Sequence, residues 1–155
     1  MLTLEGFQAG LSWLTILRKR DAFREAFRGF DPLVVSRFDD RDRARLMADA
    51  TIVRNRAKID ATIDNAAALL AVAKELGSFD QYLTGFVPTP PSRLPPEAAP
   101  GTLPATTSVS DALSRDLKKR GFRFVGSTVV YSFMQAVGLV DDHLPACFLY
   151  RGDPK

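Results

Sequence analysis

Apolar residues recur along this chain mostly at intervals of about three and four, which is the spacing of an amphipathic helix. No long run alternates apolar and polar residues, so no strand is predicted and the expected fold class is all-α. The longest predicted helix runs over 55–76, and Gly77 ends it. Shorter helices are predicted over 22–28 after Asp21, 33–38 after Asp31, 39–49, and 79–86 after Ser78; residues 4–19 are predicted to form a turn that feeds a helix.

Residues 88–104 interrupt this helical pattern. Seven of the ten prolines lie there, and proline is excluded from the interiors of helices and central strands. An irregular, partly extended segment is therefore predicted, either as a domain linker or as a surface loop. The roughly 50 residues that follow are few for an independent core, so we favour a single domain over residues 1–155.

The last third of the chain predicts a helix-hairpin-helix over residues 110–138. Ser110 is the candidate N-cap of its first helix, Gly121 ends that helix, and a second helix is predicted over 128–137. Backbone N–H groups around Gly126, at the start of the second helix, can bind a phosphate oxygen. The pattern alone is equally typical of an ordinary helical hairpin.

The net charge of +3 is mild, but basic residues cluster in two places. Five lie within 115–123, where Asp116 is the only acid, and three lie within 54–58. Such clusters are typical either of a phosphate-binding surface or of a solvated helix face. The candidates for contacting DNA are Gly126, Lys118, Lys119 and Arg123.

Length and composition narrow the class of protein. The 155 residues include no apolar run near the roughly 18 residues of a membrane span, so no membrane partner is expected. A single cysteine excludes an intrachain disulfide and is typical of a reducing, cytoplasmic location. We expect a monomer.

Seven blocks of sequence resemble the DNA-3-methyladenine glycosylase I family. In chain order they are 4–13 (LEGFQAGLSW), 54–59 (RNRAKI), 110–114 (SDALS), 117–122 (LKKRGF), 124–126 (FVG), 131–136 (YSFMQA) and 142–143 (DH). The resemblance implies a helical, base-flipping glycosylase of the helix-hairpin-helix superfamily. It implies hydrolysis of the N-glycosidic bond of 3-methyladenine in alkylated double-stranded DNA, the first step of base excision repair. Thr128 stands where bifunctional relatives carry a lysine, so a monofunctional hydrolase is expected.

The resemblance also implies roles for two residues of the first block. Glu5 matches a pocket glutamate whose carboxylate accepts a hydrogen bond from the flipped base, which makes it a catalytic and base-binding candidate. Trp13, the only tryptophan, matches a pocket aromatic that stacks on the cationic base. Without the matching block, Glu5 would be interpreted as a solvated helix residue and Trp13 as a core residue.

Residues 140–143 (VDDH) are similar to the context in which the wider superfamily carries a catalytic aspartate. That aspartate stabilises an oxocarbenium ion or activates water. Members of the 3-methyladenine family often carry asparagine at the matching position. Asp141 is therefore a candidate either for catalysis or for a helix cap.

His143 and Cys147 are the only histidine and the only cysteine, and on a helix they would share one face and chelate a metal. The resemblance implies a structural zinc whose other two ligands come from a segment of about thirty residues that precedes the first block in the family. We therefore expect an N-terminally truncated chain with half of the zinc site and reduced stability and activity. A buried thiol beside a capping histidine is the alternative.

Two other functions stay open. The chain could be a catalytically impaired helix-hairpin-helix DNA-binding fragment, or a helical interaction protein with no role at nucleic acids. Base release from methylated DNA distinguishes the glycosylase from the first alternative. A steep dependence of DNA affinity on salt distinguishes that alternative from the second.

Overall fold

The computed structural model describes residues 1–88, 91–99, 101 and 103–150. Within them the only β-type pairing is an isolated bridge between Arg93 and Asp141, which confirms the all-α class. None of the helices in this part of the chain is long and apolar enough to cross a membrane. The helices are α1 (Leu2–Gln8), α2 (Trp13–Arg18), α3 (Arg20–Ala26), a 3-10 turn η1 (Arg28–Phe30), α4 (Pro32–Val35), α5 (Asp40–Ala48), α6 (Arg56–Leu76), α7 (Phe79–Thr84), α8 (Ser108–Lys119) and α9 (Ser127–Ala136).

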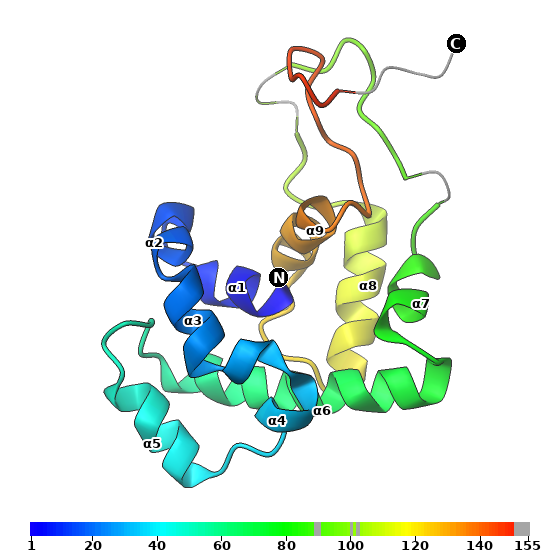
Figure 1. Cartoon of the computed structure of the whole chain (residues 1–155). Coiled ribbons are helices and arrows are strands. Elements are labelled where there is room, and N and C mark those ends of the chain that lie inside the picture. The colour runs from blue at the N-terminus through cyan, green and yellow to red at the C-terminus, as the bar shows by residue number, and fades with distance from the viewer. Residues whose placement is uncertain (89–90, 100, 102, 151–155) are drawn as a thin grey trace.

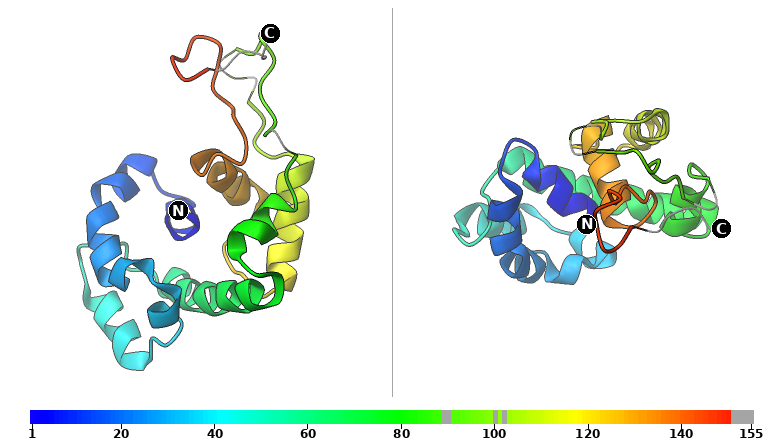
Figure 2. Two further views of the ribbon diagram at one scale, coloured as in Figure 1. Left: turned by 45° about the vertical axis from the view of Figure 1, so that its right-hand side comes forward. Right: turned by 90° about the horizontal axis from the view of Figure 1, so that it is seen from above.

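Helix α6 is the base on which the other helices are arranged (Figure 1). It contacts α4 and α5 on one side and α7 on the other. Helices α2–α5 form one arm and α7–α9 form the other, and α1 lies between the arms (Figure 2). Because α1 contacts both α6 and α9, residues from the two ends of the sequence meet there.

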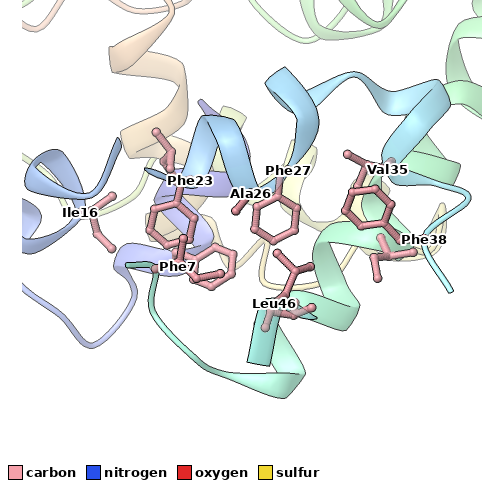
Figure 3. Packing of buried hydrophobic residues seen from close by; sticks show 13 residues of the cluster. Phe7, Ile16, Phe23, Ala26, Phe27, Val35, Phe38 and Leu46 are labelled. Carbon is pink, nitrogen blue, oxygen red and sulfur yellow. The ribbon is translucent and has the colours of Figure 1, made fainter. Parts of the chain in front are cut away.

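Each arm has its own hydrophobic core. In the first, four phenylalanines pack around α1 and α3, and the ring centroids of Phe7 and Phe23 lie 4.6 Å apart (Figure 3). The second core joins α8 and α9 to the end of α6 through residues such as Leu117 and Met134, which are fully buried. Burial of each such side chain contributes about 1.5–3 kcal/mol against the entropy cost of folding, so both cores stabilise their arms.

Several predicted helix ends are confirmed. The Asp31 carboxylate accepts a hydrogen bond from the Leu33 N–H at 2.8 Å, and α4 begins directly after it. Side chains of Asn55 and Ser78 cap α6 and α7 in the same way. Gly77 ends α6 with φ of +88°, a left-handed conformation that glycine adopts without strain.

Three predicted starts are wrong. Residues 4–8, expected as part of a turn, lie in α1 (Leu2–Gln8), and the turn follows at 9–12. Helix α3 begins at Arg20, so Asp21 lies in its first turn instead of capping it. Helix α8 begins at Ser108, because Thr107 and Ser110 satisfy each other's backbone N–H groups in a capping box, and Ser110 is the inner partner of that box.

The proline-rich segment is irregular, as predicted, in the residues of 88–104 that the structure describes. Residues 89–90, 100 and 102 of this segment lie outside the described part, and so do residues 151–155 of the predicted domain. The segment meets the chain after α9, because the Asp141 N–H donates to the Ser92 carbonyl oxygen at 2.9 Å. This contact brings a third part of the sequence to the end of α9.

Candidate active site

The two base-binding candidates, Glu5 and Trp13, line one surface cavity of about 540 Å³ between α1, α2 and α9. Residues three apart on a helix share a face, which puts Gln8 beside Glu5 on α1. The remaining lining residues are Met1, Ser132, Gln135 and Ala136. Without the matching sequence block, Glu5 would be expected on a solvated helix face and Trp13 in the core. In the structure both residues line the cavity instead.

The turn between α1 and α2 sets the position of Trp13. Gly10 has φ of +81°, in the left-handed region that favours glycine, and it reverses the chain after α1. The Ser12 hydroxyl then accepts a hydrogen bond from the Thr15 N–H at 3.2 Å, so α2 begins at Trp13. The half-buried indole packs against the first hydrophobic core and also faces the cavity.

Glu5 is nearly buried, and its carboxyl lines the cavity without a donor among the described residues. The residue is 5% exposed, and no side chain in the described part of the protein donates a hydrogen bond to its carboxyl. Burial raises the pKa of the Glu5 carboxyl, and the nearby α-amino group of Met1 offsets part of that increase. The Glu5 oxygens are not among the fully buried atoms that lack a partner, so they keep contact with solvent in the cavity, where a ligand that donates N–H groups would replace that solvent.

Lys58 fits neither interpretation of the 54–58 cluster, whereas Arg54 and Arg56 are exposed. Lys58 is 8% exposed, and its ammonium donates to the carbonyl oxygens of Phe7 at 2.9 Å and Ala9 at 2.6 Å. Lys58 is therefore neither a phosphate contact nor part of a solvated face, because its charge is directed at the end of α1. Arg56 is exposed and pairs with Asp60 at 3.1 Å.

The hairpin predicted over 110–138 consists of α8, a turn at 120–126 and α9. Gly121 has φ of +89° and starts the turn. The buried Ser114 hydroxyl donates to the Val125 carbonyl at 2.6 Å, and the hydroxyls of Ser110 and Ser127 lie 2.8 Å apart. These contacts between residues near in sequence fix the start of α9.

The start of α9 is open to an anion. Gly126 is its N-cap, and among the described residues no side chain accepts a hydrogen bond from its first N–H groups. A Cβ added at Gly126 would meet no described atom within 4 Å, so space remains in front of these groups. The open N-terminus of α9 fits the predicted phosphate site at Gly126. Lys118 and Lys119 are exposed, but they lie in the last turn of α8, whereas the start of α9 contacts the first turn of α8 through Ser110 and Ser127.

Arg123 differs from these two lysines. Its guanidinium donates to the Asp64 carboxylate of α6 at 2.8 Å, and its side chain is 47% exposed. Its backbone N–H and carbonyl both bond to the Asn65 side chain, at 2.7 and 2.9 Å. The turn is thus fastened to α6 at Arg123, whose charge is already partly balanced by an acid.

Asp141 lies outside the cavity of Glu5 and Trp13. It lines an adjoining cavity of about 300 Å³ together with Arg93, whose Nε lies 3.5 Å from the Asp141 Oδ2. The Oδ1 atom is buried and has no hydrogen-bond partner in the described residues. No helix begins after Asp141 in residues 103–150, so its interpretation as a helix cap is wrong. Gln135 lines both cavities and connects them.

Sequence reasoning missed the contribution of α9 to the cavity. Ser132 and Gln135 stand three apart in the YSFMQA block, and this spacing on one helix face was a usable signal. Asp142 accepts hydrogen bonds from the Tyr131 hydroxyl and, at 3.1 Å, from the Gln135 amide. Burial and the neighbouring Asp142 raise the pKa of the Tyr131 phenol, so Tyr131 remains a neutral donor.

His143 and Cys147 do approach each other, but not on a shared helix face. Residues 143–147 form a turn in which the Cys147 N–H donates to the Leu144 carbonyl at 2.8 Å. The His143 Nδ1 and Cys147 Sγ atoms are 3.6 Å apart. In the part of the chain that the structure describes, no group of three or more His, Cys, Asp or Glu side chains is placed to hold a metal ion.

Comparison with known proteins gives consistent matches over almost the whole chain. A family model described as methyladenine glycosylase matches residues 1–150. DNA-3-methyladenine glycosylase 1 of Escherichia coli (strain K12) is 47% identical over 153 residues, which cover 99% of this chain and 81% of that protein.

Solved structures resemble the fold equally well. A crystal structure of 3-methyladenine DNA glycosylase I superimposes with a TM-score of 0.92 at 45% identity, over 97% of this chain and 82% of that one. The 3-methyladenine DNA glycosylase I of Staphylococcus aureus, described for its recognition of 3-methyladenine, gives a TM-score of 0.90 at 40% identity, over 95% and 78%.

Proposed function

This chain belongs to the methyladenine glycosylase family, and we propose that it hydrolyses the N-glycosidic bond of 3-methyladenine in alkylated DNA. The observation that carries the proposal is Glu5, a nearly buried residue whose carboxyl has no donor among the described residues and lines the same cavity as the only tryptophan. A carboxylate and an indole are the two groups that a cationic adenine derivative requires. The carboxylate accepts from its exocyclic amine, and the indole face attracts its delocalised charge.

Hydrolysis of this N-glycosidic bond requires few catalytic groups beyond those that bind the base in the cavity. An N-methylated base in DNA already carries a positive charge, so it departs as a neutral molecule without strong general-acid catalysis. Glu5 and Trp13 hold the flipped base, at a gain of about 1–3 kcal/mol for stacking. The enzyme releases the free base and leaves an abasic site.

Helix α9 links base binding to DNA binding. Its N-terminus at Gly126 carries the free N–H groups, and Ser132, Gln135 and Ala136 near its other end line the cavity. Ten helical residues span about 15 Å, so one rigid element sets the distance between a backbone phosphate and the flipped base. The substrate in this proposal is double-stranded DNA, bound by a monomer through Gly126, Lys118, Lys119 and Arg123.

Asp141 has a supporting place in this proposal. It would stabilise positive charge that develops on the sugar, because its Oδ1 is buried without a partner in the cavity next to that of Glu5. Arg93 pairs with the other carboxylate oxygen and holds the side chain in place.

His143 and Cys147 fit two positions of a structural zinc site. A cysteine sulfur at about 2.3 Å and a histidine nitrogen at about 2.0–2.1 Å from a tetrahedral zinc ion lie about 3.6 Å apart, which matches the separation of these two atoms. When bound, zinc would cross-link the segment after α9 to further ligands. We propose that these two side chains are half of that site.

Release of base from methylated DNA tests the proposed activity. Duplex DNA treated with a methylating agent is incubated with the chain, and released bases are separated by chromatography. The proposal predicts release of 3-methyladenine that falls at least tenfold in Glu5→Gln, since a hydrogen bond to a charged group is worth about 1.5–3 kcal/mol.

The same assay identifies the alternative function. A chain that binds duplex DNA with a steep dependence on salt, but releases no base, would be the catalytically impaired DNA-binding fragment. The open N-terminus of α9 favours this second candidate, because it requires only the hairpin.

A further inference from the structure

Lys58 is the only lysine among the buried residues of the described chain, and the proposed chemistry gives it no role. We propose that Lys58 is a positioning residue: it holds the C-terminal end of α1 and the turn to α2, and thereby sets the positions of Glu5 and Trp13 in the cavity. This inference rests on the proposed function only in taking that cavity as the base-binding site.

The contacts of Lys58 are directed at one short stretch of backbone. From the first turn of α6, its ammonium donates to the carbonyl oxygens of Phe7 and Ala9, which are 51 and 49 residues away in sequence. These carbonyls lie at the end of α1, where helix carbonyls lack partners within the helix. The positive charge also interacts favourably with the negative end of the helix dipole.

No other partner explains a buried ammonium at this site. Within the described residues the ammonium of Lys58 forms no ion pair, and the centroid of the Phe124 ring lies 5.8 Å from it. Burial lowers the pKa of Lys58, so the protein bears a desolvation cost for this charge. In return, the hydrogen bonds of Lys58 fix the position of the C-terminal end of α1.

The cavity depends on that fixed end because its own elements are short. Helix α1 has 7 residues and α2 has 6, and helices of this length are not stable on their own. Their positions are therefore set by contacts to the rest of the fold. Glu5 lies two and four residues before the bonded carbonyls and Trp13 lies four residues after Ala9, so Lys58 holds the segment between the two base-binding residues.

A matched pair of lysine substitutions on α6 tests this role. Lys58→Met retains the apolar stem and removes the donor, and Lys74→Met makes the same change at an exposed site in the last turn of the helix. Two quantities are measured on each folded protein: the affinity for free 3-methyladenine, and the quenching of Trp13 fluorescence by acrylamide. Affinity for undamaged duplex is the reference, because general loss of structure would lower it as well.

The proposal predicts a selective effect in Lys58→Met. Affinity for 3-methyladenine falls by between about tenfold and about a hundredfold, as expected when binding groups are misplaced by about 1 Å, and Trp13 becomes more accessible to acrylamide. Affinity for undamaged duplex stays within about twofold of the unsubstituted protein. Lys74→Met matches the unsubstituted protein in all three measurements.

Equal base affinity and equal Trp13 quenching in Lys58→Met and Lys74→Met would overturn the proposal. If Lys58→Met does not fold, Lys58→Gln, a shorter neutral donor, takes its place, and the same two changes are expected in the same direction. If the unsubstituted chain binds no 3-methyladenine, the proposed function fails. The quenching of Trp13 still decides whether Lys58 positions the turn.

Discussion

The hairpin and the base cavity are built in opposite ways. The start of α9 is held by Ser114 and Ser127 through contacts that span 11 and 17 residues of sequence. The cavity joins α1 to α9, more than a hundred residues apart, and its turn is held by Lys58 of α6. The hairpin, which is held by contacts between residues near in sequence, presents backbone N–H groups that can bind any phosphate. The base cavity must select one base, and its side chains come from segments far apart in the sequence.

Glu5→Gln should have the largest effect, and it should impair base binding in the cavity without affecting DNA binding by the hairpin. The amide keeps the shape of the side chain but replaces the charged carboxylate that accepts from the exocyclic amine of the base. Affinity for free 3-methyladenine should fall by about 1.5–3 kcal/mol, while affinity for undamaged duplex is unchanged. Isothermal titration measures both, and Glu25→Gln, at an exposed site on α3, is the matched control. A parallel loss of duplex affinity would show that the two regions are not separable.

Ser114→Ala should destabilise the hairpin without affecting base binding in the cavity. It removes the donor to the Val125 carbonyl and leaves that buried carbonyl without a partner, at a cost of about 1–3 kcal/mol in the free energy of unfolding. Duplex affinity should fall with it, whereas the base affinity of the folded fraction should not. Urea denaturation with Ser108→Ala, an exposed residue of the same helix, as the control checks the expectation. Equal stability of the two variants would contradict it.

Reversal of Lys118 and Lys119 to glutamate should weaken binding to every DNA sequence alike, because phosphates carry no base information. The slope of log affinity against log salt concentration should decrease by about 1 for each lysine that no longer binds a phosphate. Lys74→Glu, which lies on another helix, should leave the slope unchanged. An unaltered slope in the Lys118 and Lys119 double variant would mean that these lysines form only a solvated face.

The smallest expected effect is a stability change at Glu5 that depends on pH. Because burial raises the folded-state pKa of Glu5, its contribution to stability is fully present below the pKa of the unfolded chain and is lost as pH rises through the folded-state value. Each unit of that difference is worth about 1.4 kcal/mol. Glu5→Gln should therefore melt higher than the unsubstituted protein at pH 7 and equally at pH 4. A lower melting temperature of Glu5→Gln at pH 7 would contradict the sign.

The sequence predicts those helix ends that are determined by residues close together in the chain. Asn55 and Gly77 bound α6 because a side-chain acceptor and a left-handed glycine act within one turn of the helix. Residues 4–8 lie in α1 where the pattern predicts a turn, since a 7-residue helix is stabilised by its contacts with α6 and α9 and not by its own sequence. Resemblance, not periodicity, identifies Glu5 and Trp13.

Long-range contacts explain the remaining differences. In the sequence, Lys58 belongs to a basic run. No pattern within its own helix predicts that its ammonium donates hydrogen bonds at the end of α1. Gln135 joins two cavities only because α9 is flanked by α1 on one side and by the chain around Asp141 on the other. The turn that brings His143 to Cys147 is likewise not a helix, although the four-residue spacing is the same.

Fluorescence of the single tryptophan tests the central claim most directly. Trp13 is the only indole in the chain, so any change in its emission reports on the cavity. Titration with free 3-methyladenine should quench Trp13 saturably, as stacking requires, and adenine at the same concentrations should quench it far less. An emission that responds equally to both bases, or to neither, would contradict the assignment of this cavity to the methylated base.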